Sequence, residues 1–210
     1  GLPASPQPWD FQVTVAGYGD NLARAMGLAG PEGQMGWLEM FVRGAFLDAR
    51  VYRQAAFGVN GNGGAILALA VPFIAAAIGS SLVGLRFAAF LGGFALYTMI
   101  ISAVIGFGSM VVALVVMSAL SQSIVGWKLG LGQIFRALAY AQSPGVLGII
   151  PYLGALLGLW RIPTSLVAIR EISGADGGKA AILLIVGGVA AVGLTLGLSP
   201  LLLAGLVFLR

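Results

Sequence analysis

The sequence predicts an all-α fold: a polytopic transmembrane helical bundle of five spans, preceded by an N-terminal interfacial amphipathic helix. Three observations predict it. Of the 210 residues, 59% are hydrophobic and only 9% are charged, and the mean hydropathy is +1.00, whereas about a quarter of the residues in soluble proteins are charged. A chain of this length has too little interior to hide so many apolar side chains from water. The apolar residues also form long blocks whose ends carry the charges.

Residues 1–35 are the least apolar part and are expected to form an extension that is loop or short helix. Early prolines favour extended backbone there. The alternating run FQVTVAGYG, residues 11–19, fits a strand or a loop, and the loop is favoured because an isolated strand is marginally stable. Residues 21–30 fit a short helix that stops at Gly30 and Pro31.

Residues 36–63 are predicted to form an amphipathic helix and a Gly-rich linker. Arginines gather on one face of the helix and aromatic and aliphatic residues on the other, and Asp48 is expected to cap a second helical piece. This pattern suits the headgroup region of a membrane, although a helix packed on a soluble partner domain also fits. The residues expected to contact the membrane or a partner are Trp37, Arg43, Arg50, Arg53, Trp127 and Lys128.

Residues 64–210 are predicted to form the transmembrane domain. Residues 65–85 make the first span. Residues 87–127 contain no charge, and one helix of that length would be about 60 Å long, twice the hydrocarbon thickness of a bilayer. They are therefore predicted as two spans that turn near residues 106–109. Trp127 and Lys128 end the pair with the aromatic and basic residues expected at an interface.

Residues 129–143 are shorter and are predicted to form an interfacial or re-entrant helix. The fourth span is expected over residues 145–169, broken by Pro151 and Pro163, with Arg161 as its only charge. A proline-broken helix is tolerated in lipid where its neighbours satisfy the freed carbonyl groups. This span should therefore lie against the others.

A charged loop should follow the fourth span, with Arg170, Glu171, Asp176 and Lys179 in it. The fifth span is predicted over residues 180–198. The last ten residues are too few to cross a bilayer, so they either extend the fifth span beyond a kink or turn back along the surface.

Small residues and prolines are expected to let the spans approach closely. The runs GALLG and GLTLG each place two glycines four residues apart, which permits close helix packing. The residues expected to pack the spans are Pro144, Pro151, Gly154, Gly158, Arg161, Gly193 and Gly197.

Basic residues near the span ends predict the orientation, because they are retained on the cytoplasmic side. With the N-terminus in the cytoplasm, the five-span arrangement places one set of basic residues inside: Arg43, Arg50, Arg53, Arg170 and Lys179. It places the other set on the far side: Arg86, Lys128, Arg136 and Arg210.

Three stretches resemble the Ypt/Rab-interacting-protein (YIP) family of five-span membrane proteins, in its bacterial branch. They are FLDARVYRQAA (residues 46–56), FRALAYAQSPGVLGIIPYLGALLGLW (135–160) and AIREISGADGGKAA (168–181). The second is similar to the family's tyrosine–alanine–proline approach to its fourth span. Ala49 stands where the family often has proline, and residues 1–35 have no counterpart. The resemblance implies the five-span fold and a bacterial inner membrane location more than it implies a function.

The sequence argues against catalysis and for a role in contacts. Histidine and cysteine are absent, so the usual general base and the usual metal and haem ligands are missing. A serine–lysine pair is disfavoured because Lys128 and Lys179 flank the spans. No catalytic, cofactor or metal site and no nucleic-acid partner is predicted. The expected function is an accessory subunit or scaffold that contacts lipid and other membrane subunits. The alternative is a small permease whose path follows the broken fourth span and Arg161.

Overall fold

All regular structure in the described residues is helical, which confirms the predicted all-α class. The computed structural model describes residues 4–28, 34–58, 62–150 and 159–208, and only the backbone of residues 76–77, 79–103, 106, 199 and 201–208. In chain order the elements are α1 (Asp10–Ala25), α2 (Trp37–Ala45), α3 (Ala49–Phe57), α4 (Asn62–Val125), α5 (Leu131–Ala141), the 3-10 helix η1 (Ser143–Ile149), α7 (Arg161–Ser173) and α8 (Gly177–Phe208).

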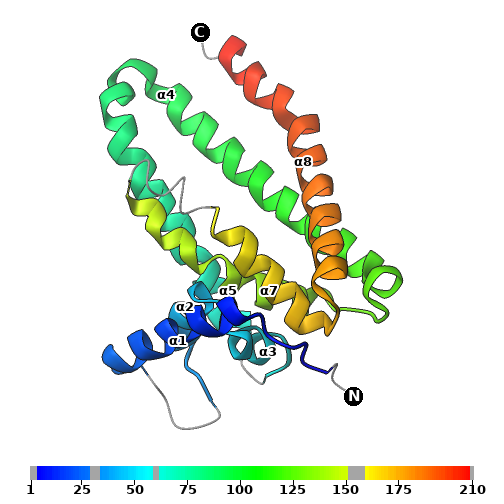
Figure 1. Cartoon of the computed structure of the whole chain (residues 1–210). Helices are drawn as coiled ribbons and strands as arrows, with labels where there is room; N and C mark the ends of the chain where they lie inside the picture. The colour runs from blue at the N-terminus through cyan, green and yellow to red at the C-terminus, as the bar shows by residue number, and fades with distance from the viewer. Residues whose placement is uncertain (1–3, 29–33, 59–61, 151–158, 209–210) are drawn as a thin grey trace.

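The short helices gather at one end of the molecule, and the long helices extend from it (Figure 1). We call the gathered part, residues 4–58 with α5 and α7, the cap. Its core is built from side chains with no exposed surface, among them Tyr52, Ile134 and Ile169. Burying one such aliphatic side chain contributes about 1.5–3 kcal/mol. Ala65, Ala68, Leu114 and Met117 of α4 and Leu183 of α8 belong to the same buried cluster, so this core joins the cap to the long helices.

α4 leaves the cap, turns back on itself and returns to the cap (Figure 1). The segments that flank the two ends of α4 meet there. Arg136 Nη1 of α5 donates to Asn62 Oδ1 at the start of α4 at 3.2 Å, and the ring of Phe57, before α4, stacks on that of Trp127, after it, with centroids 6.1 Å apart. A straight helix of this length would measure about 96 Å. Divided between the two limbs of the hairpin, that length averages about 48 Å a limb, enough to cross a bilayer once.

The turn predicted at residues 106–109 is wrong. Those residues are helical and lie in the returning limb of α4, where Ser109 Oγ lies 2.7 Å from Thr195 Oγ1 of α8. Leu194 packs within 3.7 Å of the position that a Cβ of Gly108 would occupy. The glycines of this stretch therefore sit where α8 packs against α4 instead of turning the chain.

Two helical stretches in the part described with side chains are long and apolar enough to cross a membrane. They are Phe107–Val125 in α4 and Gly177–Leu198 in α8. Only 11% of the most apolar window of α8 is buried within the protein, whereas the core helix of a soluble protein would be covered. These helices indicate association with a membrane.

The fourth span predicted over residues 145–169 is not one helix. η1 ends at Ile149 and α7 begins at Arg161; Pro151, Gly154 and Gly158 lie outside the described residues. Pro144 lies in the first turn of η1 and Pro163 in the first turn of α7, positions where proline costs no hydrogen bond. α7 then belongs to the cap, so the five-span arrangement is not confirmed.

The prediction that Arg136 lies across the membrane from Arg53 is also wrong. Arg136 belongs to the cap and bonds the end of α3, the helix that carries Arg53. The error arises because α4 makes one hairpin of two limbs where three spans were predicted before Arg136. The chain is therefore back at the cap when α5 begins.

Residues 11–19, expected to be loop, form most of α1. Gln12, Gly19 and Ala23 are its buried residues and recur along one helical face. A Cβ at Gly19 would lie 2.6 Å from Phe46 Cβ, so this glycine allows α1 to approach the end of α2. The Asp48 cap is confirmed: its carboxylate accepts from the backbone N–H of Arg50 at 3.1 Å.

Candidate functional site

An ionic cluster around Arg43 lies where α1, α2 and α3 of the cap meet. Its Nη1 lies 2.8 Å from Glu39 Oε1, its Nε lies 3.2 Å from Asp48 Oδ2, and its Nη2 pairs with Asp20. Arg50 holds Asp48 from the outside, with Nη2 3.0 Å from Oδ2. These contacts join α1, α2 and α3, because Asp20 comes from α1 and Asp48 stands at the start of α3.

Burial and neighbouring charges set the ionisation of the cluster. Desolvation lowers the pKa of Arg43, and the adjacent Asp48 carboxylate partly offsets that effect. Hydrogen bonding to Asp48 raises the pKa of the more exposed Arg50. Among the residues that the structure describes, no three acidic side chains are placed to share a metal ion. The carboxylates around Arg43 are instead neutralised by arginine.

A second polar cluster fastens the N-terminal residues to α7. The guanidinium of Arg170 lies 4.4 Å from the ring centroid of Trp9, and it donates to Gln12 Oε1 at 3.3 Å and to the carbonyl of Gln7. Ser5 Oγ donates to Glu171 Oε2 at 3.0 Å. Burial raises the pKa of Glu171, although Ser5 and two arginines act in the opposite direction.

Arg170 and Glu171 were expected in an exposed loop, and that prediction is wrong. Both lie within α7, and their side chains are 6% and 1% exposed. The apolar span predicted before them suggested that the chain had left the membrane at this point. In the structure α7 is a helix of the cap that is covered on several sides, including by residues 5–12.

Side chains from neighbouring helices satisfy the last carbonyl groups of four helices of the cap. The last four carbonyls of a helix have no partner within it. Tyr52 Oη donates to the carbonyl of Gly44 in α2 at 2.6 Å, and Thr164 Oγ1 donates to that of Ala141 in α5 at 2.8 Å. The other bonds of this kind are Trp160 to Ala45, Arg136 to Ala55 and Ala56, Arg53 to Glu171, and Trp127 to Ser173.

An apolar groove of about 560 Å³ runs along the cap between α1, α2 and η1. Tyr18 and Leu22 of α1, Phe41 of α2 and Leu147 of η1 line it, together with Trp160. Tyr18 is 66% exposed. The indole of Trp160 is held in place because its Nε1 donates to the carbonyl of Ala45 at 2.9 Å. The groove therefore presents apolar surface with a fixed shape.

The six residues predicted to contact membrane or partner do not form one stripe. Arg43 is buried, with a side chain 8% exposed, so it lies beneath the surface on which we expected it. Arg50 and Lys128 are exposed, and Trp37 is 40% exposed. Arg53 and Trp127 are half-buried and bond to carbonyl groups of α7.

Some of the predicted packing residues contact other parts of the chain and others do not. Pro144 is buried in η1, and the guanidinium of Arg161 packs directly on Gly145. Gly193 and Gly197 are exposed and have no neighbour within 4 Å of an added Cβ, so they do not pack the described part of α8. Gly187 does: its added Cβ would lie 2.6 Å from Met117 Cγ.

Sequence reasoning missed the apolar groove and the N-terminal contacts with α7. One available signal was the spacing of Gln12, Gly19 and Ala23, which repeats at helical intervals. Comparison with protein-family models, with curated proteins and with solved structures finds no match to this chain.

Proposed function

We propose that this chain is a non-catalytic integral membrane protein that acts through contacts, as an accessory subunit of a membrane complex or as a scaffold. The apolar groove carries the proposal. It offers about 560 Å³ of apolar space beside the exposed side chains of Tyr18 and Leu22. An exposed apolar surface of this kind marks a contact site.

The occupant we propose for the groove is an amphipathic helix of another membrane subunit, with its apolar face in the groove. The groove lies between helices, and a partner helix fills such a groove with apolar residues spaced three and four apart. Trp160, Tyr18 and Phe41 supply aromatic anchors of the kind enriched at interfaces. Arg50 and Lys128 remain proposed contacts with headgroups or with a partner's charges.

We further propose the bacterial inner membrane as the location, with the cap in the cytoplasm, and membership of the YIP family. The distribution of charge supports this orientation. Among the described residues, every basic residue except Arg86 belongs to the cap or to the chain segments that enter and leave it. Basic residues that flank spans are retained on the cytoplasmic side.

Site-specific photo-cross-linking tests the proposal. A photoreactive phenylalanine analogue in place of Tyr18 should form adducts with one or a few membrane proteins in the producing cell. The same analogue in place of Ile185, which is 63% exposed on α8, is the matched control and should react mainly with lipid. Adducts to lipid alone from both positions would show that the groove faces the bilayer and that the proposal is wrong.

The permease remains the competing prediction. Its path would run through residues 151–158, outside the described part of the chain. Arg161, its expected polar residue, packs on Gly145. Solute flux into vesicles that is lost on Arg161→Leu, with the groove giving no protein adduct, would favour the permease over the scaffold.

A further inference from the structure

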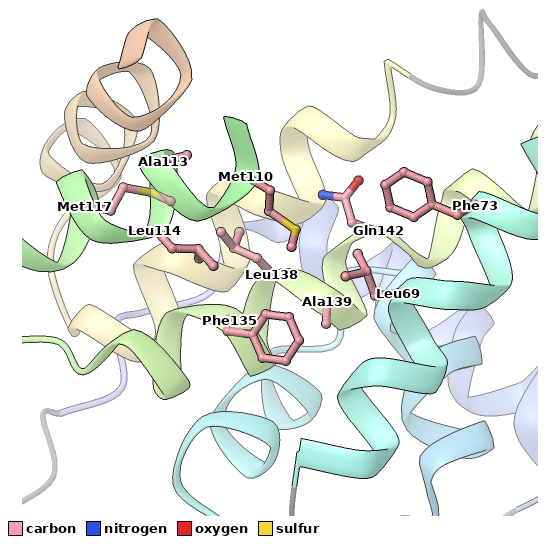
Figure 2. Close-up of a pocket in the computed structure, with 10 residues that line it drawn as sticks. All are labelled: Leu69, Phe73, Met110, Ala113, Leu114, Met117, Phe135, Leu138, Ala139 and Gln142. Carbon is pink, nitrogen blue, oxygen red and sulfur yellow. The ribbon is translucent and has the colours of Figure 1, made fainter. Parts of the chain in front are cut away.

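A second apolar space lies between the two limbs of α4 and the end of α5, away from the groove. It has a volume of about 230 Å³ (Figure 2). Phe73 comes from the outgoing limb of α4, Met110 and Met117 from the returning limb, and Phe135 and Gln142 from α5 and its end. Met117 lies about 12 Å along the helix from its end at Val125. The space is therefore within the predicted hydrocarbon region, near the cap.

Among the described residues that line this space, Gln142 supplies the one polar side chain, and we call the space the Gln142 cavity. Its amide makes no hydrogen bond within the described part of the chain, and in the view of Figure 2 it lies between the side chains of Met110 and Phe73. Both backbone groups of Gln142 are hydrogen-bonded: its N–H donates to the carbonyl of Leu138, and its carbonyl accepts from the N–H of Gly145 at 2.8 Å. The helix end thus fixes the residue while its amide stays free to bind.

A cleft of about 300 Å³ adjoins the cavity, between residues 66–73 and 107–110 of α4. Leu69, Phe73 and Met110 line both spaces. The remaining wall of the cleft includes Ile66 and Phe107, which are exposed. In a membrane these exposed side chains are in contact with lipid. A long apolar molecule can therefore reach the cavity from the bilayer with its tail in the cleft.

The lining indicates the chemistry of the end that enters the cavity. None of the described residues that line it is charged, so a charged end would find no partner among them and would be buried at high cost. Two phenylalanines and two methionines favour an aromatic or quinonoid ring, through ring contacts and sulfur–ring contacts. An apolar cavity of about 150 Å³ accepts benzene, so 230 Å³ has room for a substituted ring.

We propose that the Gln142 cavity binds the ring of an isoprenoid quinone, with the Gln142 amide donating to a ring carbonyl oxygen and the prenyl tail lying in the cleft. The proposal concerns binding alone and includes no electron transfer. It goes beyond the proposed scaffold function and does not depend on it, because the groove and the cavity are separate spaces with no lining residue in common.

The test uses the whole chain in phosphatidylethanolamine–phosphatidylglycerol nanodiscs. The probe is a ubiquinone analogue with a decyl tail that carries a diazirine. Labelling should map to the peptides that contain Phe73 and Met110, and unlabelled decylubiquinone should displace it. Gln142→Leu should weaken the apparent affinity about fivefold, as expected for one lost hydrogen bond. Gln122→Leu, an exposed glutamine of α4 outside the cavity, should leave it unchanged.

A filling variant and a second probe complete the test. Ala113→Phe should abolish labelling, and Ala113→Leu, which adds less volume, replaces it if the larger residue prevents folding. A diazirine-bearing palmitic acid distinguishes an acyl chain from a quinone. The proposal is overturned if palmitate labels the same peptides and decylubiquinone does not displace it, or if Gln142→Leu and Gln122→Leu bind the quinone probe equally.

Discussion

The guanidinium of Arg136 donates from Nη2 to the backbone carbonyl of Ala56 at 2.7 Å, across 80 residues of sequence. Its Nε donates to the neighbouring carbonyl of Ala55 at 2.8 Å. One side chain of α5 therefore satisfies two of the last carbonyls of α3, and its charge complements the negative end of that helix dipole. The same residue reaches Asn62, so it also fixes the start of α4.

Replacing Arg136 should destabilise the cap. Arg136→Met should lower the free energy of unfolding by about 3 kcal/mol, because two partly buried carbonyls lose a charged donor. Arg136→Lys should lower the free energy of unfolding by a smaller amount than Arg136→Met, since an ammonium keeps the charge but lacks the planar fork of donors. Titration with sodium dodecyl sulfate, followed by tryptophan fluorescence, measures both. Arg24→Met, whose side chain is 69% exposed, should cost less than about 1 kcal/mol; equal losses at both sites would refute the assignment.

The two arginines of the ionic cluster should differ strongly. Arg43→Met removes the buried guanidinium that Glu39, Asp48 and Asp20 share, and should cost about 3–5 kcal/mol. Arg50→Met removes a side chain that is 66% exposed and should cost about 1 kcal/mol or less. The same detergent titration measures the difference. A headgroup-binding role for Arg43 would instead show as lost vesicle binding with unchanged stability.

Glu171 should make stability depend on pH. Because burial raises its pKa above 4.5, the folded state binds its proton more tightly than the unfolded chain does. Stability should therefore fall as pH rises from about 4.5 to the raised pKa, and change no further above it. Glu171→Gln keeps an acceptor for Ser5 and should lose this slope. The free energy of unfolding of both proteins is measured across that pH window. If it changes with pH equally in the two proteins, the assignment of the slope to Glu171 is wrong.

The packing of α8 on α4 should depend on Gly187 and not on Gly193. Gly187→Leu places a side chain against Met117 and should cost about 1–3 kcal/mol by overpacking, whereas Gly193→Leu meets no neighbour. Since the chain has no cysteine, the pair Ser109→Cys and Thr195→Cys reports the contact by disulfide formation. That disulfide should form readily with Gly193→Leu and slowly with Gly187→Leu; the reverse order would place the contact elsewhere.

The hairpin of α4 predicts which residues share a side of the membrane. Single cysteines at Arg50 and at Lys128 should react with a membrane-impermeant maleimide from the same side, because both positions belong to the cap end of the molecule. The five-span arrangement puts them on opposite sides. Labelling of intact cells and of inverted vesicles separates the two arrangements.

Local signals predicted the parts of the fold that depend on nearby residues. The helical class follows from composition, and the Asp48 cap follows from an acidic residue two positions before the N–H that it accepts. The turn of α4 did not follow, because the glycines at 106 and 108 read equally as a turn and as a packing surface. Only the contact with Leu194, distant in sequence, distinguishes them.

The buried charges were missed for the same reason. Arg170 meets Gln7 and Gln12 across about 160 residues, and nothing near Arg170 in the sequence shows that Trp9 covers it. Likewise Arg43 looks like a surface residue until Asp20 of α1 is placed beside it. The groove could not be predicted either, since it is made by three elements and Trp160, whose arrangement depends on those long-range contacts.

α8 starts at the cap and runs to the far end of the molecule, where α4 turns back, while Trp9 and its neighbours stay at the cap (Figure 1). With the orientation proposed above, fluorescent or enzymatic reporters joined to the two ends of the chain should sit in different compartments. A green fluorescent domain and an alkaline phosphatase exchanged between the two ends would each work at only one of them.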